Sequence, residues 1–484
     1  MTAPVIPPSD SLTTLTALEL SRGIHAREFS CAEVMGAYLD RIERLNPRFN
    51  ALISMRPRDD LMAEARLADD EIAAGRSRGW MHGLPQAPKD LSDTAGIATV
   101  MGSPAMKGRV PTADAIQVER IRAAGAILIG KTNTPEFGLG SHTYNPVFGT
   151  TLGAWDTARS AGGSSGGAAV ALATGMLPVA DGSDMMGSLR NPAGWNNVYG
   201  FRPTFGRVPG AGPDLYLNQL ACDGPMGRNV ADLAMLLATQ AGHDPRDPLS
   251  LAGDGQEFAQ PLDAEVKGRR IGWLGDLDGY LATEPGLIET CETALAQFET
   301  LGCKVEPVGI GFAMERLWTS WVTLRNWLVA GKLGALYDNP ATRDLLKPEA
   351  IWEIEQGRSL TATQVHAASV ERSAWFRHLR GLYRDYDALV LPTAQLFAFD
   401  SDLHWPTEIA GRAMDTYHRW MEVVIPASMA GLPALAVPAG FGASGLPIGL
   451  QIMGPHLGDR AILELGHAYD MVQPHTSRIN PLLS

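Results

Sequence analysis

The sequence contains only four cysteines, lacks a run of basic residues and has no long apolar stretch. The cysteines, at positions 31, 222, 291 and 303, are irregularly spaced and form neither a CxxC pair nor a zinc-ligand pattern with histidines. This spacing encodes neither a disulfide framework nor a zinc site, so we expect four reduced thiols in the core. We expect no metal ion and no cofactor.

Positive charge is also scarce. Of 484 residues, 40 are Lys or Arg and 53 are Asp or Glu, which gives a formal net charge of −13. A protein that binds phosphate backbones needs a basic face, and no cluster of Lys or Arg supplies one here. The composition therefore excludes a nucleic-acid partner and favours a small molecule.

No apolar segment reaches the roughly 18 residues that a membrane span needs. The longest candidate, residues 166–180, is interrupted by Gly175 and Pro178. The first ten residues, MTAPVIPPSD, have neither the basic nor the apolar region of a secretory signal, and we expect a mobile tail over residues 1–10. We therefore expect a cytoplasmic protein that does not contact a membrane.

Helices and strands alternate along the chain. Ser30 and Glu33 form a capping box before a helix that we expect to stop at Asn46-Pro47, and a second helix covers residues 61–74. Three steps from helix to strand follow. The first leads from helix 114–124 to strand 126–130, and the second from helix 168–174 to strand 177–180 and the loop 181–188. The third begins with strand 271–274 and leads through helix 287–301 to strand 304–308. This order predicts an α/β/α sandwich with a large, twisted, mixed and mostly parallel sheet flanked by helices.

No internal repeat or low-complexity linker divides the chain, so we expect one continuous domain over residues 11–484. Its parts are a helical layer (11–75), a catalytic core (76–250), a helical, cap-like segment (311–379), and closing strands and helices (385–484). Seven of the 11 tryptophans lie between Trp318 and Trp420. We expect most of them in the core rather than against a ligand.

Two serines in glycine-rich surroundings are the candidate reactive groups. Ser164 lies in GGSSGG and Ser188 in DGSDMMGS, 24 residues further on, while Lys89 lies upstream in LPQAPKD. Flanking glycines let the backbone turn sharply and approach a ligand closely. A serine must lose its proton as it attacks, and a lysine can accept that proton if burial lowers its pKa.

Simpler interpretations of these residues exist. GGSSGG alone is typical of a flexible linker or a phosphate-binding loop, and an isolated serine or lysine usually lies at the surface. A linker is not expected inside an alternating helix and strand pattern, and no GK[ST] sequence follows the glycines. Acyl transfer by an activated serine is the interpretation that we favour.

The chain resembles the amidase signature family in several segments. GGSSGG, the Gly187-Ser188-Leu-Arg190 that follows it, and Pro-Lys89-Asp carry the resemblance. It continues through AILIGKTNTPEFG, NNVYGFRPTFGRVPG, GPMGRNVADLAMLL and GLPIGLQIMGP, which together span most of the chain. The segment around Ser188 is most similar to amidases that cleave nylon oligomers, such as the 6-aminohexanoate cyclic dimer, and to aryl acylamidases and urethanases.

The resemblance implies a role for each matched residue. Ser188 is the nucleophile, Lys89 is the base, and Ser164, which follows a cis peptide bond, passes the proton between them. The oxyanion hole consists of backbone N–H groups from the loop Met185, Met186, Gly187 and Ser188. Neighbouring positions support the site without touching substrate: Gly163, Ser165, Asp184 and Arg190.

The loop before Ser188 departs from the family pattern. Family members have a Gly-Gly pair before the serine, whereas this chain has Met186-Gly187. A methionine is strained if its position requires a positive φ, and otherwise its side chain lines the acyl pocket. We expect the second outcome.

The resemblance implies a serine hydrolase that forms an acyl-enzyme and acts on aryl or alkyl amides, nylon oligomers, esters and carbamates. The tryptophans and the loop 209–222 predict a roomy, apolar pocket. Two alternatives are the glutaminase subunit of a tRNA-dependent amidotransferase and a binding protein of the same fold that lost its chemistry. The oligomeric state is open, with a homodimer as one option.

Overall fold

The structure is a computed structural model that describes residues 9–478 and 480–483. Of the tail expected over residues 1–10, positions 1–8 lie outside the described residues, and a short helix α1 begins at Ser9 (Ser9–Leu12). Within the described ranges, no helix is both long and apolar enough to cross a membrane. The four cysteines are buried and unpaired, as expected.

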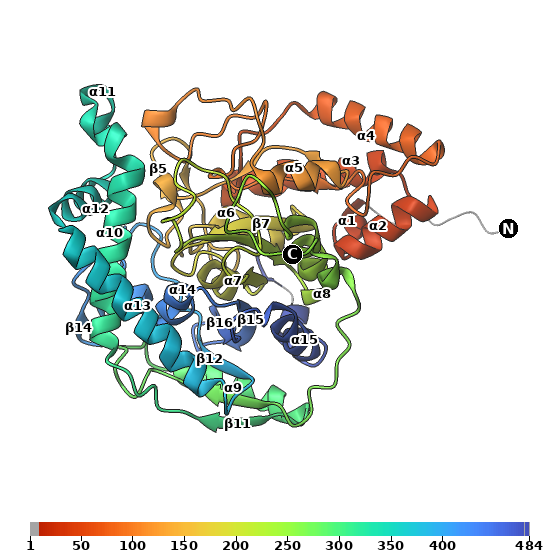
Figure 1. Ribbon diagram of the computed structural model, residues 1–484. Coiled ribbons are helices and arrows are strands. Elements are labelled where there is room, and N and C mark those ends of the chain that lie inside the picture. The colour runs from red at the N-terminus through yellow and green to blue at the C-terminus, as the bar shows by residue number, and fades with distance from the viewer. Residues whose placement is uncertain (1–8, 479, 484) are drawn as a thin grey trace.

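A central sheet of eight strands organises the molecule (Figure 1). From one edge to the other its strands are β11 (Lys304–Pro307), β10 (Arg270–Trp273), β12 (Ala388–Pro392), β16 (Pro447–Met453), β15 (Ala434–Phe441), β8 (Tyr199–Arg202), β9 (Cys222–Gly227) and β7 (Val179–Asp184). The sheet is mixed and flanked by helices, which confirms the predicted α/β architecture.

The strand directions differ from the prediction of a mostly parallel sheet. Only β10 pairs in parallel, with β11 and with β12, whereas the other five pairings are antiparallel. Parallel strands need a crossover, which α9 (Leu287–Thr300) supplies between β10 and β11. Strands β15 and β16 are instead joined by a short turn, so they form an antiparallel hairpin.

Helices pack on both faces of the sheet. On one face, α6 (Gly166–Ala173) and α7 (Arg190–Asn196) contact each other, while α8 (Val230–Gln240), α9 and α15 (Asp459–Asp470) cover the other. Leu435 of β15 packs under Gly466 of α15, and the next residue, Ala436, shares a core cluster with Ala193 of α7. Successive side chains of a strand point to opposite faces, so β15 supports both layers.

The N-terminal helical layer lies above the sheet in the view of Figure 1. Its helices are α2 (Ala17–Ala26), α3 (Cys31–Phe49) and α4 (Arg58–Ala73), and α5 (Ile116–Ala123) from the segment 76–250 lies beside them. Ser30 caps α3 through the predicted capping box, but the helix continues to Phe49 instead of stopping at Asn46-Pro47. Pro47 lies in the last turn of the helix, which ends where the N–H of Asn50 caps the Asn46 carbonyl at 2.7 Å.

Two predicted strands have different bounds. The expected strand 126–130 is reduced to β3 (Ile127–Leu128), which pairs in parallel with β2 (Pro85–Gln86) outside the main sheet. Strand β7 continues to Asp184, so half of the expected loop 181–188 belongs to the sheet. Further two-residue pairs are β1 (Leu52–Ile53) with β4 (Lys131–Thr132), β5 (Tyr144–Asn145) with β6 (Gly149–Thr150), and β13 (Glu408–Ile409) with β14 (Arg412–Ala413).

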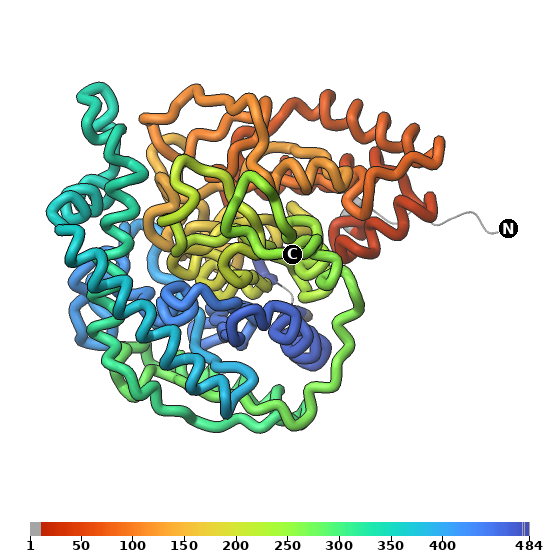
Figure 2. Tube along the Cα trace, viewed as in Figure 1, coloured from red at the N-terminus to blue at the C-terminus, as the bar shows by residue number. Residues whose placement is uncertain are grey.

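The segment 311–379 is nearly all helix, as predicted. It forms α10 (Met314–Asp338), α11 (Pro340–Arg343), α12 (Pro348–Ser359) and α13 (Ala362–Leu382), which lie together along one side of the molecule (Figures 1 and 2). Helix α13 also contacts α14 (Ile425–Ala430). Trp321 and Trp375 are fully buried in this region, which agrees with the expected core role of tryptophan.

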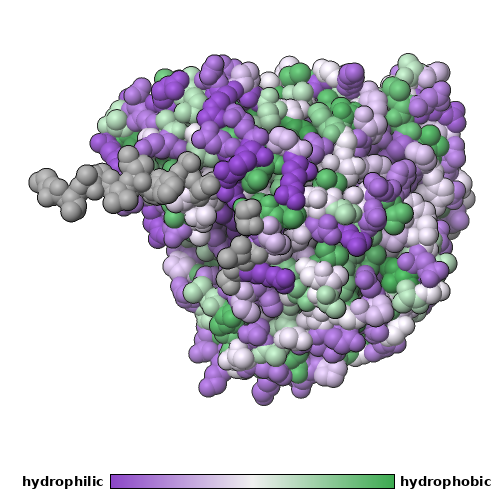
Figure 3. Space-filling model, turned by 180° about the vertical axis from the view of Figure 1, so that it is seen from behind, coloured by the Kyte–Doolittle hydropathy of each residue, from purple (hydrophilic) through white to green (hydrophobic). Residues whose placement is uncertain are grey.

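The opposite face of the molecule carries interspersed hydrophilic and hydrophobic side chains, without a large area of either kind (Figure 3). A mixed surface of this kind is usual for a protein whose large apolar residues are mostly buried in its core.

Candidate active site

The structure brings Lys89 and the first glycine-flanked serine into direct contact. Lys89 follows β2, and its Nζ donates hydrogen bonds to the hydroxyl oxygens of Ser164 at 2.7 Å, Ser165 at 2.9 Å and Ser183 at 3.1 Å. All three acceptors are neutral, so no carboxylate is bonded to the amine. The lysine thus sits in a cluster of hydroxyl groups.

Ser164 and Ser165 lie in the turn that opens α6, and the Gly163-Ser164 peptide bond is cis. Ser188 lies in the turn between β7 and α7, and its carbonyl accepts a hydrogen bond from the N–H of Ser165 at 3.3 Å. Ser164 and Ser188 line the same cavity. No hydrogen bond joins their two hydroxyls in the described part of the chain, and such bonds are often long in unliganded enzymes.

Burial dominates the electrostatics of Lys89. Its side chain is fully inaccessible to water, and this desolvation lowers its pKa to about 7. The negative charges of Asp223, Asp181 and Asp184 act in the opposite direction and limit the shift. A substantial fraction of Lys89 is therefore neutral near pH 7, which is the state that a base requires.

Two carboxyl groups near Lys89 were not identified from the sequence. Asp181 of β7 accepts a hydrogen bond from the Lys89 backbone N–H at 3.1 Å and so anchors the lysine. Asp223 of β9 lies opposite Ser183 in the β7 and β9 pairing, and burial raises the pKa of its carboxyl to about 6. Ser183 itself was also missed, because only the strand register places it beside Lys89.

Gly187 fixes the shape of the loop before Ser188. Its φ of +77° is unfavourable for other residues, and a Cβ there would come within 2.7 Å of the Val424 side chain. Met186, in contrast, has no positive φ, and its side chain is 2% exposed and lines the cavity. The methionine is therefore accommodated without backbone strain, as expected.

A buried ion pair holds this loop. The Asp184 carboxylate accepts hydrogen bonds from the N–H of Gly187 at 2.9 Å and of Leu189 at 3.2 Å, and from Arg190 at 2.9 Å. The guanidinium groups of Arg190 and Arg202 hold the Asp184 pKa well below its usual range, despite complete burial. Asp184 and Arg190 thus determine the loop conformation and do not line the cavity.

The four backbone N–H groups of this loop are not equivalent. That of Gly187 is engaged by Asp184, whereas those of Met185, Met186 and Ser188 have no acceptor among the described residues. Unengaged N–H groups beside a reactive hydroxyl are suited to an oxyanion. The loop therefore offers three candidate donors instead of the four predicted.

The cavity beside the serines has a volume of about 90 Å³. Its core side carries Ser164, Ser183 and Ser188, and its other side is a face of α10. Its apolar wall consists of leucine, methionine, valine and phenylalanine side chains: Leu91, Phe137, Leu139, Met185, Met186, Val329, Leu333 and Met421.

The expectation of a roomy pocket shaped by tryptophan and the loop 209–222 was wrong. Among the described residues no tryptophan lines the cavity, and this loop contributes only Ala221. The tryptophans of the helical segment are instead used in packing. Trp318 and Trp321, for example, are 4% and 0% exposed.

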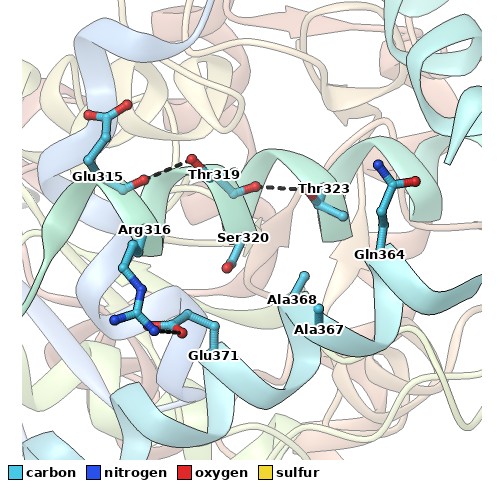
Figure 4. Close-up of a pocket in the computed structure, with 9 residues that line it drawn as sticks. All are labelled: Glu315, Arg316, Thr319, Ser320, Thr323, Gln364, Ala367, Ala368 and Glu371. Atoms are coloured by element: carbon cyan, nitrogen blue, oxygen red, sulfur yellow. Dashed lines mark hydrogen bonds and ion pairs between the residues drawn. The ribbon is translucent and has the colours of Figure 1, made fainter. Parts of the chain in front are cut away.

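A second hollow lies at the surface between α10 and α13 (Figure 4). Its wall carries an ion pair between Arg316 and Glu371, with Thr319 and Thr323 one and two turns along α10. None of the residues predicted to act in the site lines this hollow. The serine-lined cavity is therefore the candidate active site.

Comparison with known proteins identifies the family. The model of the amidase family matches residues 33–463, which is most of the chain. The chain therefore belongs to the amidase family and is an amide-hydrolysing enzyme. This agrees with the family suggested by the sequence motifs.

Individual relatives include both hydrolases and a component of an amidotransferase. The chain is 32% identical over 483 residues to a glutamyl-tRNA(Gln) amidotransferase subunit from Cyanothece sp., covering 95% of this chain and 98% of that one. A solved bacterial aryl acylamidase of the amidase signature family superposes with a TM-score of 0.89 at 27% identity, covering 95% and 96% of the two chains. A 6-aminohexanoate cyclic dimer hydrolase superposes with a TM-score of 0.87 at 26% identity, covering 98% and 99%.

Replacing Gly187 by alanine tests the importance of the loop shape. We expect Gly187→Ala to reduce amide hydrolysis by about a hundredfold or more, because a displaced loop removes oxyanion donors from their positions. Initial rates with an anilide substrate measure the effect. Gly331→Ala is the control, since Gly331 lies exposed on α10 with nothing near its Cβ position. Equal rates for Gly187→Ala and the wild type would show that the loop is not critical.

Proposed function

We propose that the protein hydrolyses carboxylic amides through an acyl-enzyme on Ser188. The observation that carries this proposal is the buried Lys89, whose pKa is near 7 and whose amine contacts Ser164 in the cavity that Ser188 also lines. When the amine is neutral, its lone pair can accept the Ser164 O–H, and a base of this kind in the same cavity as Ser188 is suited to activating that serine.

In the first half-reaction, the Ser188 hydroxyl oxygen attacks the amide carbonyl carbon. Its proton moves to Ser164, and the Ser164 proton moves to the Lys89 amine, which becomes an ammonium group. The carbonyl oxygen becomes an oxyanion that accepts hydrogen bonds from the free N–H groups of the loop, those of Met185, Met186 and Ser188. Lys89 then returns the proton through Ser164 to the leaving amine as the C–N bond breaks.

In the second half-reaction, water attacks the acyl-enzyme ester. The same relay accepts a proton from the water and returns it to the Ser188 oxygen as the carboxylic acid leaves. Ser165 and Ser183 also accept hydrogen bonds from Lys89, at 2.9 Å and 3.1 Å. We assign them to holding the amine in position while it gains and loses its proton.

The proposed substrates are carboxylic amides of small molecules, including aryl or alkyl amides and nylon oligomers, with esters and urethanes as further acyl donors. The similarity in fold to an aryl acylamidase and a 6-aminohexanoate cyclic dimer hydrolase supports this class. The mainly apolar cavity wall is compatible with it. We place the enzyme in the cytoplasm as one continuous domain over residues 11–484, with a homodimer as its proposed assembly.

A glutaminase subunit of a tRNA-dependent amidotransferase is the second candidate. The identity of 32% to the glutamyl-tRNA(Gln) amidotransferase protein of Cyanothece sp. favours it. Such a glutaminase releases ammonia from glutamine and works with partner chains. The isolated chain should then hydrolyse glutamine poorly without partners, and anilides not at all. Efficient anilide turnover by the isolated chain, with no ammonia released from glutamine, separates the two functions.

Replacing Ser188 by alanine tests the nucleophile. We expect Ser188→Ala to lower nitroanilide hydrolysis by at least about a thousandfold, because no other group can form the acyl-enzyme. A fluorophosphonate probe should label Ser188 in the wild type and leave the variant unlabelled. Ser369→Ala, at an exposed position of α13, is the control. An unlabelled wild type without turnover would indicate a binding protein of the same fold.

The pH dependence tests the base. We expect kcat/KM for the wild type to rise with pH through about 7, as Lys89 loses its proton. Asp223→Asn removes a negative charge that favours the ammonium form, so the Lys89 pKa falls and the rising limb moves to lower pH. Asp402→Asn, at an exposed position, should leave the limb in place. A limb that moves to higher pH in Asp223→Asn would refute this role for Lys89.

A further inference from the structure

One face of α10 forms the wall of the cavity opposite the serines. Arg325, Val329, Lys332 and Leu333 all line the cavity, and their spacing of four, three and one residues places them on one side of the helix. Two of these side chains are cationic and two are apolar. The apolar pair is explained by the hydrophobic wall, but the cations are not used by the proposed mechanism.

Arg325 is almost fully buried, at 3% exposure, and its hydrogen bonds are unevenly distributed. Its Nε and Nη2 donate to Glu353 at 3.1 Å and 2.9 Å, and Nη2 also donates to Tyr417 at 2.8 Å. Nη1 contacts the Met185 sulfur at 3.6 Å. A thioether is a weak acceptor, so this N–H group is poorly satisfied at the cavity wall.

A second buried donor lines the same cavity. The hydroxyl of Ser141 has no hydrogen-bond partner within the described ranges, although its side chain is 2% exposed. A buried polar group without a partner is costly, and it usually has one in the functional state. Arg325 and Ser141 therefore both provide hydrogen-bond donors for which the described residues supply no adequate acceptor.

The charges around the cavity indicate a neutral acceptor. The carboxylate of Glu353 already balances Arg325 through two hydrogen bonds. Lys332 also lines the cavity, but its side chain is exposed to water, and it interacts with Asp223 only through space. Because Glu353 already pairs with Arg325, a substrate carboxylate beside this guanidinium would add an unbalanced negative charge to a buried part of the cavity. A carbonyl oxygen satisfies the donors without that penalty.

We infer that Arg325 is a specificity-determining residue whose Nη1–H donates a hydrogen bond to a second, neutral carbonyl oxygen of the substrate, with Ser141 as an additional donor. The preferred substrates thus carry an amide, urethane or ester carbonyl besides the one that is cleaved. This inference rests on the proposed amide hydrolysis at Ser188. It explains why a charged side chain is retained in a mainly apolar wall.

Matched anilides test the inference. One series compares a plain alkanoyl nitroanilide with an analogue of equal length that carries an internal amide in the acyl chain, and a second series places this amide in the amine part. A third compound carries a carboxylate in the corresponding position. We expect kcat/KM of the wild type to favour the internal amide by about ten- to a hundredfold in one of the two series, as for a hydrogen bond to a charged donor.

The variant pair Arg325→Met with Glu353→Gln removes the donor and its counterion together, so no buried charge is left unpaired. The preference for the internal amide should fall to about threefold or less in this variant. The control double variant, Arg316→Met with Glu371→Gln, removes an ion pair between α10 and α13 that lies away from the cavity. This control should keep the wild-type preference for the internal amide. Circular dichroism and probe labelling of Ser188 establish that each variant is folded and has an intact nucleophile.

The outcomes are distinct. Wild-type turnover of the plain anilide without preference for the internal amide overturns the inference and leaves the proposed function intact, and this result needs no variant. A preference that persists in the Arg325 and Glu353 variant, or a stronger preference for the carboxylate, also overturns it. No hydrolysis of any anilide by the wild type contradicts the proposed function itself.

Discussion

The removal of Lys89 from water is the constraint on which the site depends. Burial destabilises the ammonium form of Lys89, because its amine is surrounded by hydroxyl groups instead of a bonded carboxylate. The nearby carboxyl groups of Asp181 and Asp223 act through space and keep the pKa from falling further. The turn at α6, the pairing of β7 with β9 and the loop after β2 all serve this arrangement.

The second requirement is a rigid loop before Ser188. The same segment provides the buried Asp184, the positive φ of Gly187 and the free N–H groups next to the nucleophile. Arg190 extends the support to residues far along the chain by donating to the Val424 carbonyl at 2.8 Å and to Ser428 at 2.8 Å. The substitution of methionine at position 186 is accepted because the backbone geometry is set by its neighbours.

The sequence predicted the parts of the site that lie in short, glycine-rich segments. Ser164 and Ser188 were identified from such segments and Lys89 from the nearby Pro-Lys-Asp, and the helices of residues 311–379 followed from composition and periodicity. Ser183, Asp223 and Arg325 were not identified, because strand register places the first two near Lys89 and the orientation of a helix brings Arg325 to the cavity. The antiparallel directions of most strands were missed for the same reason, since strand order is a property of the whole sheet.

The division of the cavity between two structural units has a consequence for turnover. The serines belong to the rigid sheet core, whereas the opposite wall belongs to a single long helix, α10, and the space between them is about 90 Å³. Sites that hold drug-sized ligands usually measure about 300–1,000 Å³. If α10 moves away from the core to admit an aryl amide, the rate of that movement sets an upper limit on kcat that is independent of the acyl-transfer chemistry.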